Sequence, residues 1–103
     1  MTEVQFRLRH TRSLLDLDIP LIQKHLEHLG QGFQVKIYDD RASDAFFITV
    51  VVDFPDIAAS SWQRVKKAIL DLPEVIVSVV DKHGKETPIE TVRLEELKSI
   101  LTR

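Results

Sequence analysis

The hydrophobic and polar positions of this chain follow two periods, one of two residues and one of three to four. Alternation with a period of two is typical of a strand with one buried face, and it occurs at 4–9 and 33–38. Apolar residues at three- and four-residue steps are typical of an amphipathic helix. They predict helices over 18–30 and 56–72 and a last helix within 91–103.

The run at 45–54 predicts a strand that needs cover on both sides. Its odd and even positions are both mainly apolar, with Phe46, Ile48, Val50, Val52 and Phe54 on one face and Phe47, Thr49 and Val51 on the other. A strand that faces water on one side would instead alternate apolar and polar residues. We therefore expect this strand at the centre of a sheet, with a partner, ligand or further element on its second face.

Local signals set the expected ends of the helices. Asp18 is a suitable N-cap, and Pro20 lies in the first turn, where its missing N–H costs nothing. Gly30 is expected to end that helix. Asp56 or Ser60 is expected to cap the second helix.

A strand at 74–81 completes the order β-α-β-β-α-β. This order predicts an α+β, ferredoxin-like two-layer sandwich, whose antiparallel sheet has the strand order 4-1-3-2 and both helices on one face. We assign the domain to 1–85 and a C-terminal extension with an amphipathic helix to 86–103.

The helices leave the other sheet face open, and the residues expected there are the candidate interaction site. Its members are basic, aromatic or aliphatic: Arg7, Arg9, Lys36, Tyr38, Phe47, Val51 and Val80. The first interpretation is that the C-terminal helix covers this face in cis or in a swapped dimer, through Leu94, Leu97, Ile100 and Leu101. The second is dimerisation through the sheet face or edge. The third is a nucleic-acid platform with stacked bases on the aromatic rings.

Composition limits the class of function. The chain has 103 residues and a net charge of −2, which argues against nucleic acid as the partner. It has no cysteine, which excludes disulfides, thiolate metal sites and thiol nucleophiles and fits a cytoplasmic protein. No apolar run approaches the roughly 18 residues of a membrane span. No catalytic motif is present, and we predict neither an enzyme nor a cofactor.

Acidic residues gather in the loops that this topology brings to one end of the sheet. A hard cation such as Mg²⁺ or Ca²⁺ would find carboxylates there, from Asp16, Asp39, Asp40 and Asp44. Caps and turn formers explain the same residues. We therefore predict no resident metal and keep a divalent-cation-responsive domain as an alternative.

Two parts of the sequence resemble the entries to strands two and four in ACT-like regulatory domains. One is the segment that joins Gly30 to Phe33-Gln34-Val35, and the other is Leu72-Pro73-Glu74-Val75-Ile76-Val77-Ser78-Val79. Among these, the chain is similar to the cytosolic C-terminal domain of MgtC-type magnesium-transport accessory membrane proteins. The resemblance covers about three-quarters of the chain. The loop His10–Leu15 has no glycine, unlike the loop that gives an amino acid room in ACT domains.

The resemblance implies a non-enzymatic regulatory or protein-interaction module that acts through homodimerisation or within a larger assembly. A nucleic-acid-associated protein that uses the open face is the alternative from the residues alone. We expect no membrane insertion by this segment.

Overall fold

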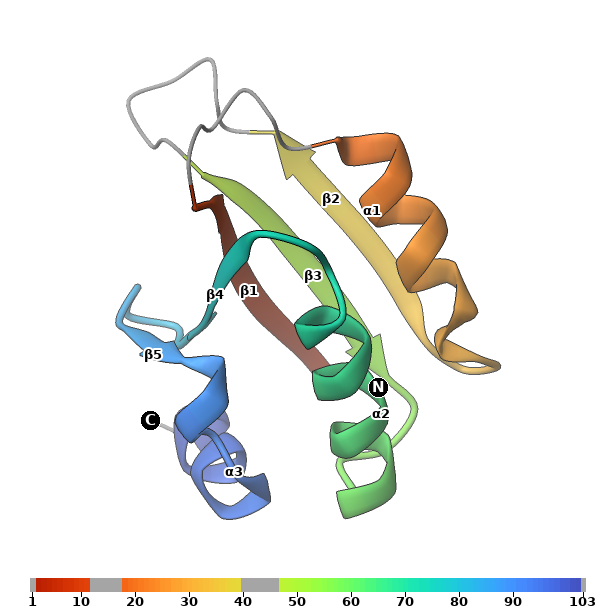
Figure 1. Cartoon of the computed structure of the whole chain (residues 1–103). Helices are drawn as coiled ribbons and strands as arrows, with labels where there is room; N and C mark the ends of the chain where they lie inside the picture. Colours follow the sequence, from red (N-terminus) through yellow and green to blue (C-terminus); the bar gives the residue numbers. More distant parts are fainter. Residues whose placement is uncertain (1, 12–17, 40–46, 103) are drawn as a thin grey trace.

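The computed structural model describes residues 2–11, 18–39 and 47–102. In these residues a strand, a helix, two strands, a second helix and a further strand follow one another, and a short strand and a last helix come after them. The strands form one sheet and the helices pack against it (Figure 1). The predicted α+β class is thereby confirmed.

The described strands form an antiparallel sheet in the order β2-β3-β1-β4-β5. They are β1 (Thr2–His10), β2 (Gln34–Asp39), β3 (Ile48–Phe54), β4 (Val75–Val80) and β5 (Glu86–Pro88). Read from the β5 edge, the order is 5-4-1-3-2. The four-stranded sheet of order 4-1-3-2 therefore needs correction, because β5 extends the described sheet beyond β4.

The middle strands β1 and β3 supply many of the buried apolar side chains. Val4, Phe6 and Leu8 of β1 are at most 1% exposed. Every second side chain of β3, from Ile48 to Phe54, is fully buried on the same side. Two helices cover this side, α1 (Ile19–Leu26), which continues into the 3₁₀ turn η2 (Glu27–Leu29), and α2 (Ala59–Leu70).

Trp62 of α2 lies at the centre of this core. Its ring stacks on Phe6 with a centroid distance of 6.2 Å and an interplanar angle of 8°, and Phe54 lies 6.4 Å away. The buried indole Nε1 donates a hydrogen bond to the carbonyl of Val92 at 3.0 Å. Trp62 therefore ties the sheet, α2 and the C-terminal part of the chain together.

Helix capping follows the sequence at α1 and departs from it at α2. Asp18 is the N-cap of α1, and its carboxylate accepts a hydrogen bond from Leu21 N at 3.1 Å. The N-cap of α2 is Ala58, which has no capping side chain, so the expected cap was wrong. The Asp56 carboxylate instead accepts a hydrogen bond from the Ser61 hydroxyl at 2.8 Å.

The chain after β4 belongs to the same core. It forms β5, the 3₁₀ turn η3 (Ile89–Thr91) and α3 (Leu94–Thr102). Its buried members in the core cluster are Ile89, Val92, Leu97 and Ile100. Whether 1–85 folds without this segment stays a prediction. Within the described residues, the structure has no helix that is long and apolar enough to span a membrane.

Candidate functional site: the open face of the sheet

We call the sheet side opposite the three described helices the open face. The strand register places these side chains on it: Glu3, Gln5, Arg7 and Arg9 of β1, Gln34, Lys36 and Tyr38 of β2, Thr49, Val51 and Asp53 of β3, Ile76, Ser78 and Val80 of β4, and Glu86 and Pro88 of β5. Phe47, directly before β3, joins them through its contact with Arg7. The structure thus brings the predicted open-face residues together.

Arg7 is the centre of the open face. Its guanidinium carbon lies 4.4 Å from the ring centroid of Phe47, a cation–π distance. Its Nη1 donates to Glu86 Oε2 at 3.1 Å across β4. These two contacts hold the side chain in place, and 26% of it remains exposed. Arg7 is therefore an ordered cationic group with its remaining surface available to a partner.

The apolar members of the open face divide into a covered centre and an exposed rim. Val51 and Val80 are each 7% exposed. Gln5 and Lys36 are the register neighbours of Val51, and the stems of such long side chains cover apolar surface while their heads stay in water. Tyr38 and Ile76 are 51% and 55% exposed. A partner would gain more from these two rim residues than from the centre.

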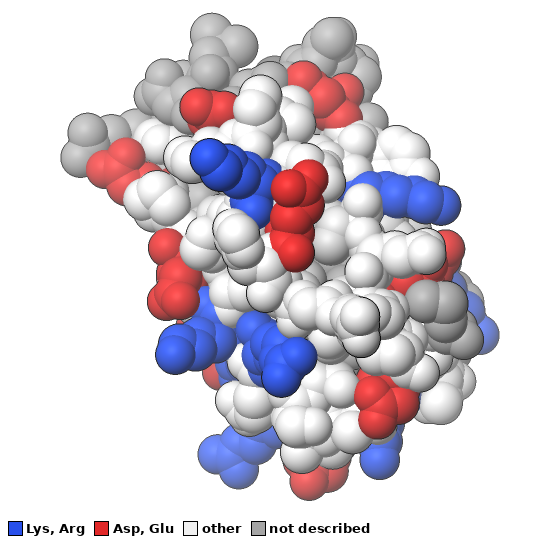
Figure 2. Space-filling model, turned by 90° about the vertical axis from the view of Figure 1, so that its right-hand side faces the viewer, with Lys and Arg blue, Asp and Glu red and all other residues white. Residues whose placement is uncertain are grey.

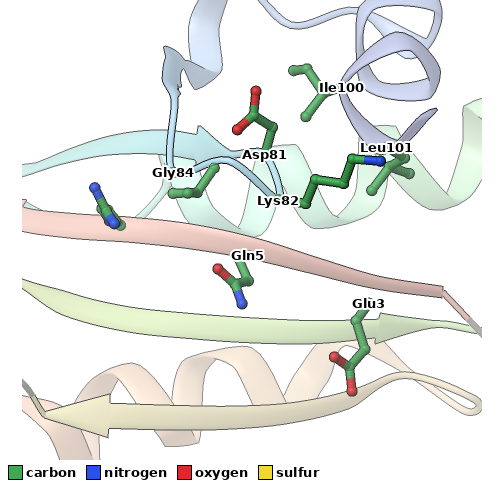
Figure 3. A pocket seen from close by; sticks show the side chains of 9 residues that line it. Glu3, Gln5, Asp81, Lys82, Gly84, Ile100 and Leu101 are labelled. Carbon is green, nitrogen blue, oxygen red and sulfur yellow. The ribbon is translucent and has the colours of Figure 1, made fainter. Parts of the chain in front are cut away.

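Shallow hollows follow the open face around Arg7. One of about 460 Å³ is lined by Glu3, Gln5, Arg7, Lys36, Tyr38, Phe47, Thr49 and Val51. Another of about 360 Å³ lies where the pairing of β1 with β4 stops at Gln5, and the last turn of α3 and the loop after β4 wall it (Figure 3). A third of about 250 Å³ lies over β1, β4 and β5. Open hollows of this kind suit a protein surface better than a small ligand, which prefers a concave apolar pocket.

Charges on the open face balance each other. Among the described residues, Glu3, Asp53 and Glu86 supply three acidic groups, and Arg7, Arg9 and Lys36 supply three basic groups. On the side of the molecule where α1 lies, Lys and Arg are likewise interspersed with Asp and Glu (Figure 2). In the part of the chain that the structure describes, neither surface has the one-signed basic patch that phosphate binding requires.

The C-terminal helix does not lie where the sequence interpretation put it. Leu97 and Ile100 are 0% and 3% exposed and belong to the core cluster of Trp62, on the side of α2. Leu94 and Leu101 pack against the same cluster, and Figure 1 shows α3 beside α2. The expected cover over Phe47, Val51 and Val80 is therefore wrong for the described helix. Only its last turn reaches the rim of the open face, in the hollow of Figure 3.

The expected metal ligands form no described cluster. Of the acidic set, Asp16, Asp40 and Asp44 lie outside the described residues, and Asp39 ends β2. Within 2–11, 18–39 and 47–102, no three acidic or histidine side chains come together as a metal site would need. His25 Nε2 lies 2.8 Å from the carbonyl of Ala68, which ties α1 to α2.

The sequence interpretation missed Glu86, which completes the ion pair of Arg7. Glu86 lies on β5, a strand of three residues that includes a proline and shows no alternation. The sequence does carry a turn signal, which is Gly84. In the structure this glycine has a φ of 82° and lies between the paired strands β4 and β5. The carboxylate of Asp81 supports this turn by accepting hydrogen bonds from His83 N and Lys85 N at 2.8 and 2.9 Å.

Comparison of the chain with protein-family models, with curated proteins and with solved structures finds no match.

Proposed function

We propose that this chain is a non-enzymatic interaction module of the ACT-like type, with a ferredoxin-like core extended by β5, and that it acts by binding a second copy of itself through the open face. The observation that carries the proposal is the open face itself. It holds two of the four large exposed hydrophobic side chains among the described residues, Tyr38 and Ile76. The three described helices all contribute to the core on the other side.

The size of the open face supports this proposal. The sheet has five strands, which lie about 4.8 Å apart, and a strand of about seven residues is about 23 Å long at 3.3 Å per residue. The flat area of the open face is therefore roughly 500 Å². Side-chain relief raises the accessible area toward the ~800 Å² per partner of a standard interface. Tyrosine, phenylalanine and arginine are enriched in protein interfaces, and Tyr38, Phe47 and Arg7 all lie on the open face.

Balanced charge favours a protein partner over nucleic acid. Arg7 already has Glu86 as its ion-pair partner, and Asp53, in the row next to Lys36, would repel a phosphate backbone that approached Lys36. A second copy of the chain carries both acidic and basic groups, so it can pair with both kinds of group on the open face.

Light scattering on the full chain tests the proposal, with Tyr38→Asp as the interface variant and Leu70→Asp as its control. Leu70 is 45% exposed on α2, so it matches Tyr38 in exposure and lies on the helical side. We expect a dimer for the unmodified chain and for the control, and a monomer for Tyr38→Asp. A monomeric unmodified chain at about 1 mM, a concentration that detects millimolar affinity, would contradict the proposal.

Binding of a single-stranded RNA oligonucleotide in low salt is the second arm of this test. Phosphate contacts are strongest there, so a nucleic-acid platform would bind. We expect no binding by the unmodified chain. Binding that Arg9→Ala abolishes would overturn the proposal in favour of the nucleic-acid alternative.

A further inference from the structure

Among the described residues of β1, β2 and β3, the open face has an acidic end and a basic end. Glu3, Asp53 and Gln34 share one row across β1, β3 and β2. Arg9 lies six residues further along β1, about 20 Å away at 3.3 Å per residue, beside Ile76. Glu3 and Arg9 are both exposed and, within the described residues, neither has an ion-pair partner. Along β1, from Glu3 to Arg9, the charge therefore changes sign.

This polarity distinguishes the possible two-fold axes of a face-to-face dimer. A two-fold axis parallel to the strands would place each row of side chains opposite the same row of the partner, with Arg9 near the second Arg9. An axis across the strands reverses the rows and places Glu3 of one copy opposite Arg9 of the other. Because a two-fold interface repeats every contact, the second arrangement gives two attractive pairs where the first gives like charges.

The central rows fit the same axis. Gln5 and Arg7 are neighbours of one face on β1, in adjacent rows. Reversing the rows places the Gln5 amide opposite the guanidinium of the partner, so the oxygen of the amide can accept a hydrogen bond from it. The same reversal on β2 places Lys36 of one copy opposite Tyr38 of the other. An ammonium group then faces a phenol ring, as in a cation–π contact.

We infer that two copies of the chain pack open face to open face, about a two-fold axis that runs across the strands, and that Glu3 and Arg9 pair between the copies. The inference rests on the proposed function and specifies the geometry of that same interface. The juxtaposition that carries it is the opposite charge at the two ends of one central strand.

Two single charge reversals test the pairing between copies. In a dimer of Arg9→Glu, each of the two pairs between positions 3 and 9 consists of two acidic residues. In a dimer of Glu3→Arg, each of these pairs consists of two basic residues. We expect each variant alone to self-associate roughly tenfold more weakly or worse in low salt, since two pairs change from attraction to repulsion. An equimolar mixture of the two variants restores both pairs, so it is expected to form a mixed dimer with affinity near that of the unmodified chain.

Native mass spectrometry or sedimentation of the mixture, with a mass tag on one variant, gives the readout. The matched control is a mixture of Lys24→Glu and Glu27→Arg, two exposed positions in the helical layer. This control mixture should form dimers to the same extent as the unmodified chain, with tagged and untagged copies paired at random. The rescue should weaken in salt of about 0.5 M, where charges are screened within a few ångströms.

The outcomes separate the geometry from the proposed function. A dimer that Tyr38→Asp breaks, but whose affinity neither single charge reversal weakens, keeps the interface and overturns the axis. An unmodified chain that is a monomer overturns both. Two weakened single variants whose mixed dimer regains, without exceeding, the affinity of the unmodified chain support the axis. An axis parallel to the strands would also favour the mixed dimer, but there each single variant would bind like the unmodified chain and the mixed dimer would bind more tightly than it.

Discussion

The two faces of one sheet differ in what they do for this molecule. On the helical side, Val4, Phe6 and Leu8 of β1 are fully enclosed and Trp62 closes the layer above them. On the other side, the residues between them are charged or polar, and the structure places no described helix there. Most of the buried apolar side chains lie on the helical face, while the other face is the surface that we propose for association.

Each face also has its own kind of order. The helical side is held by dense apolar packing, which is sensitive to the loss of a single methylene group. The open face is held by one ion pair and one cation–π contact around Arg7. Contacts of that kind contribute little to the stability of a monomer. Substitutions on the two sides should therefore change different measurements.

The largest effect is expected from removing the chain after Lys85. That truncation takes Ile89, Val92, Leu97 and Ile100 out of the core and exposes Trp62. At about 1.5 kcal/mol or more for each buried aliphatic side chain, the loss is roughly 6 kcal/mol, similar to the whole stability of many domains. We expect no cooperative urea unfolding by circular dichroism. A truncated chain with unchanged stability would contradict the single shared core.

A smaller loss is expected for Trp62→Phe. The substitution leaves a cavity and removes the hydrogen bond to Val92 O, for about 1–3 kcal/mol in urea unfolding. Lys66 Nζ also donates to that carbonyl at 3.1 Å, so the carbonyl stays paired. The double variant Trp62→Phe with Lys66→Met leaves the carbonyl without either donor. Its loss should exceed the sum of the single losses, and strict additivity would contradict this shared acceptor.

At the edge of the sheet, Asp81→Ala should cost about 1–2 kcal/mol, because the buried carboxylate accepts from two backbone N–H groups in the turn before β5. Asp81→Asn keeps an acceptor oxygen and is the matched control, with a smaller expected loss. Equal losses in thermal unfolding for the two variants would mean that charge, and not hydrogen-bond acceptance, is what the turn needs.

The smallest effect on folding is expected on the open face itself. Glu86→Gln removes the ionic part of the pair with Arg7, whose side chains are 26% and 31% exposed. Partly exposed pairs contribute little, so the free energy of unfolding should fall by less than about 0.5 kcal/mol. A loss as large as that of Asp81→Ala in the same urea titration would show that the open face also carries folding energy.

Sequence periodicity predicted the buried positions of both layers because burial repeats every second residue in a strand and every third or fourth in a helix. Val4, Phe6 and Leu8, and Trp62, Val65 and Ile69, are buried where the pattern placed them. The predicted strand order 4-1-3-2 differs from the described order β2-β3-β1-β4-β5, because the sequence did not predict β5.

The sequence could not place α3 or β5. The stripe of Leu97 and Ile100 says that the helix buries one side, but it does not say which surface receives it. A buried indole N–H needs an acceptor, and the carbonyl of Val92 that meets this need has no signature in the sequence. β5 is too short for a pattern, so the partner of Arg7 became known only from the register of β4 with β5.

The central claim, that the open face binds a second copy and carries little folding energy, is tested most directly by melting temperature against protein concentration. Ile76→Asp and Leu21→Asp change side chains that are 55% and 52% exposed, one on the open face and one on α1. Because a dimer stabilises the folded state by mass action, the melting temperature should rise with concentration for the unmodified chain and for Leu21→Asp. For Ile76→Asp it should stay constant, at the value that the unmodified chain reaches on dilution. A concentration-dependent melt that Ile76→Asp leaves unchanged would contradict the account.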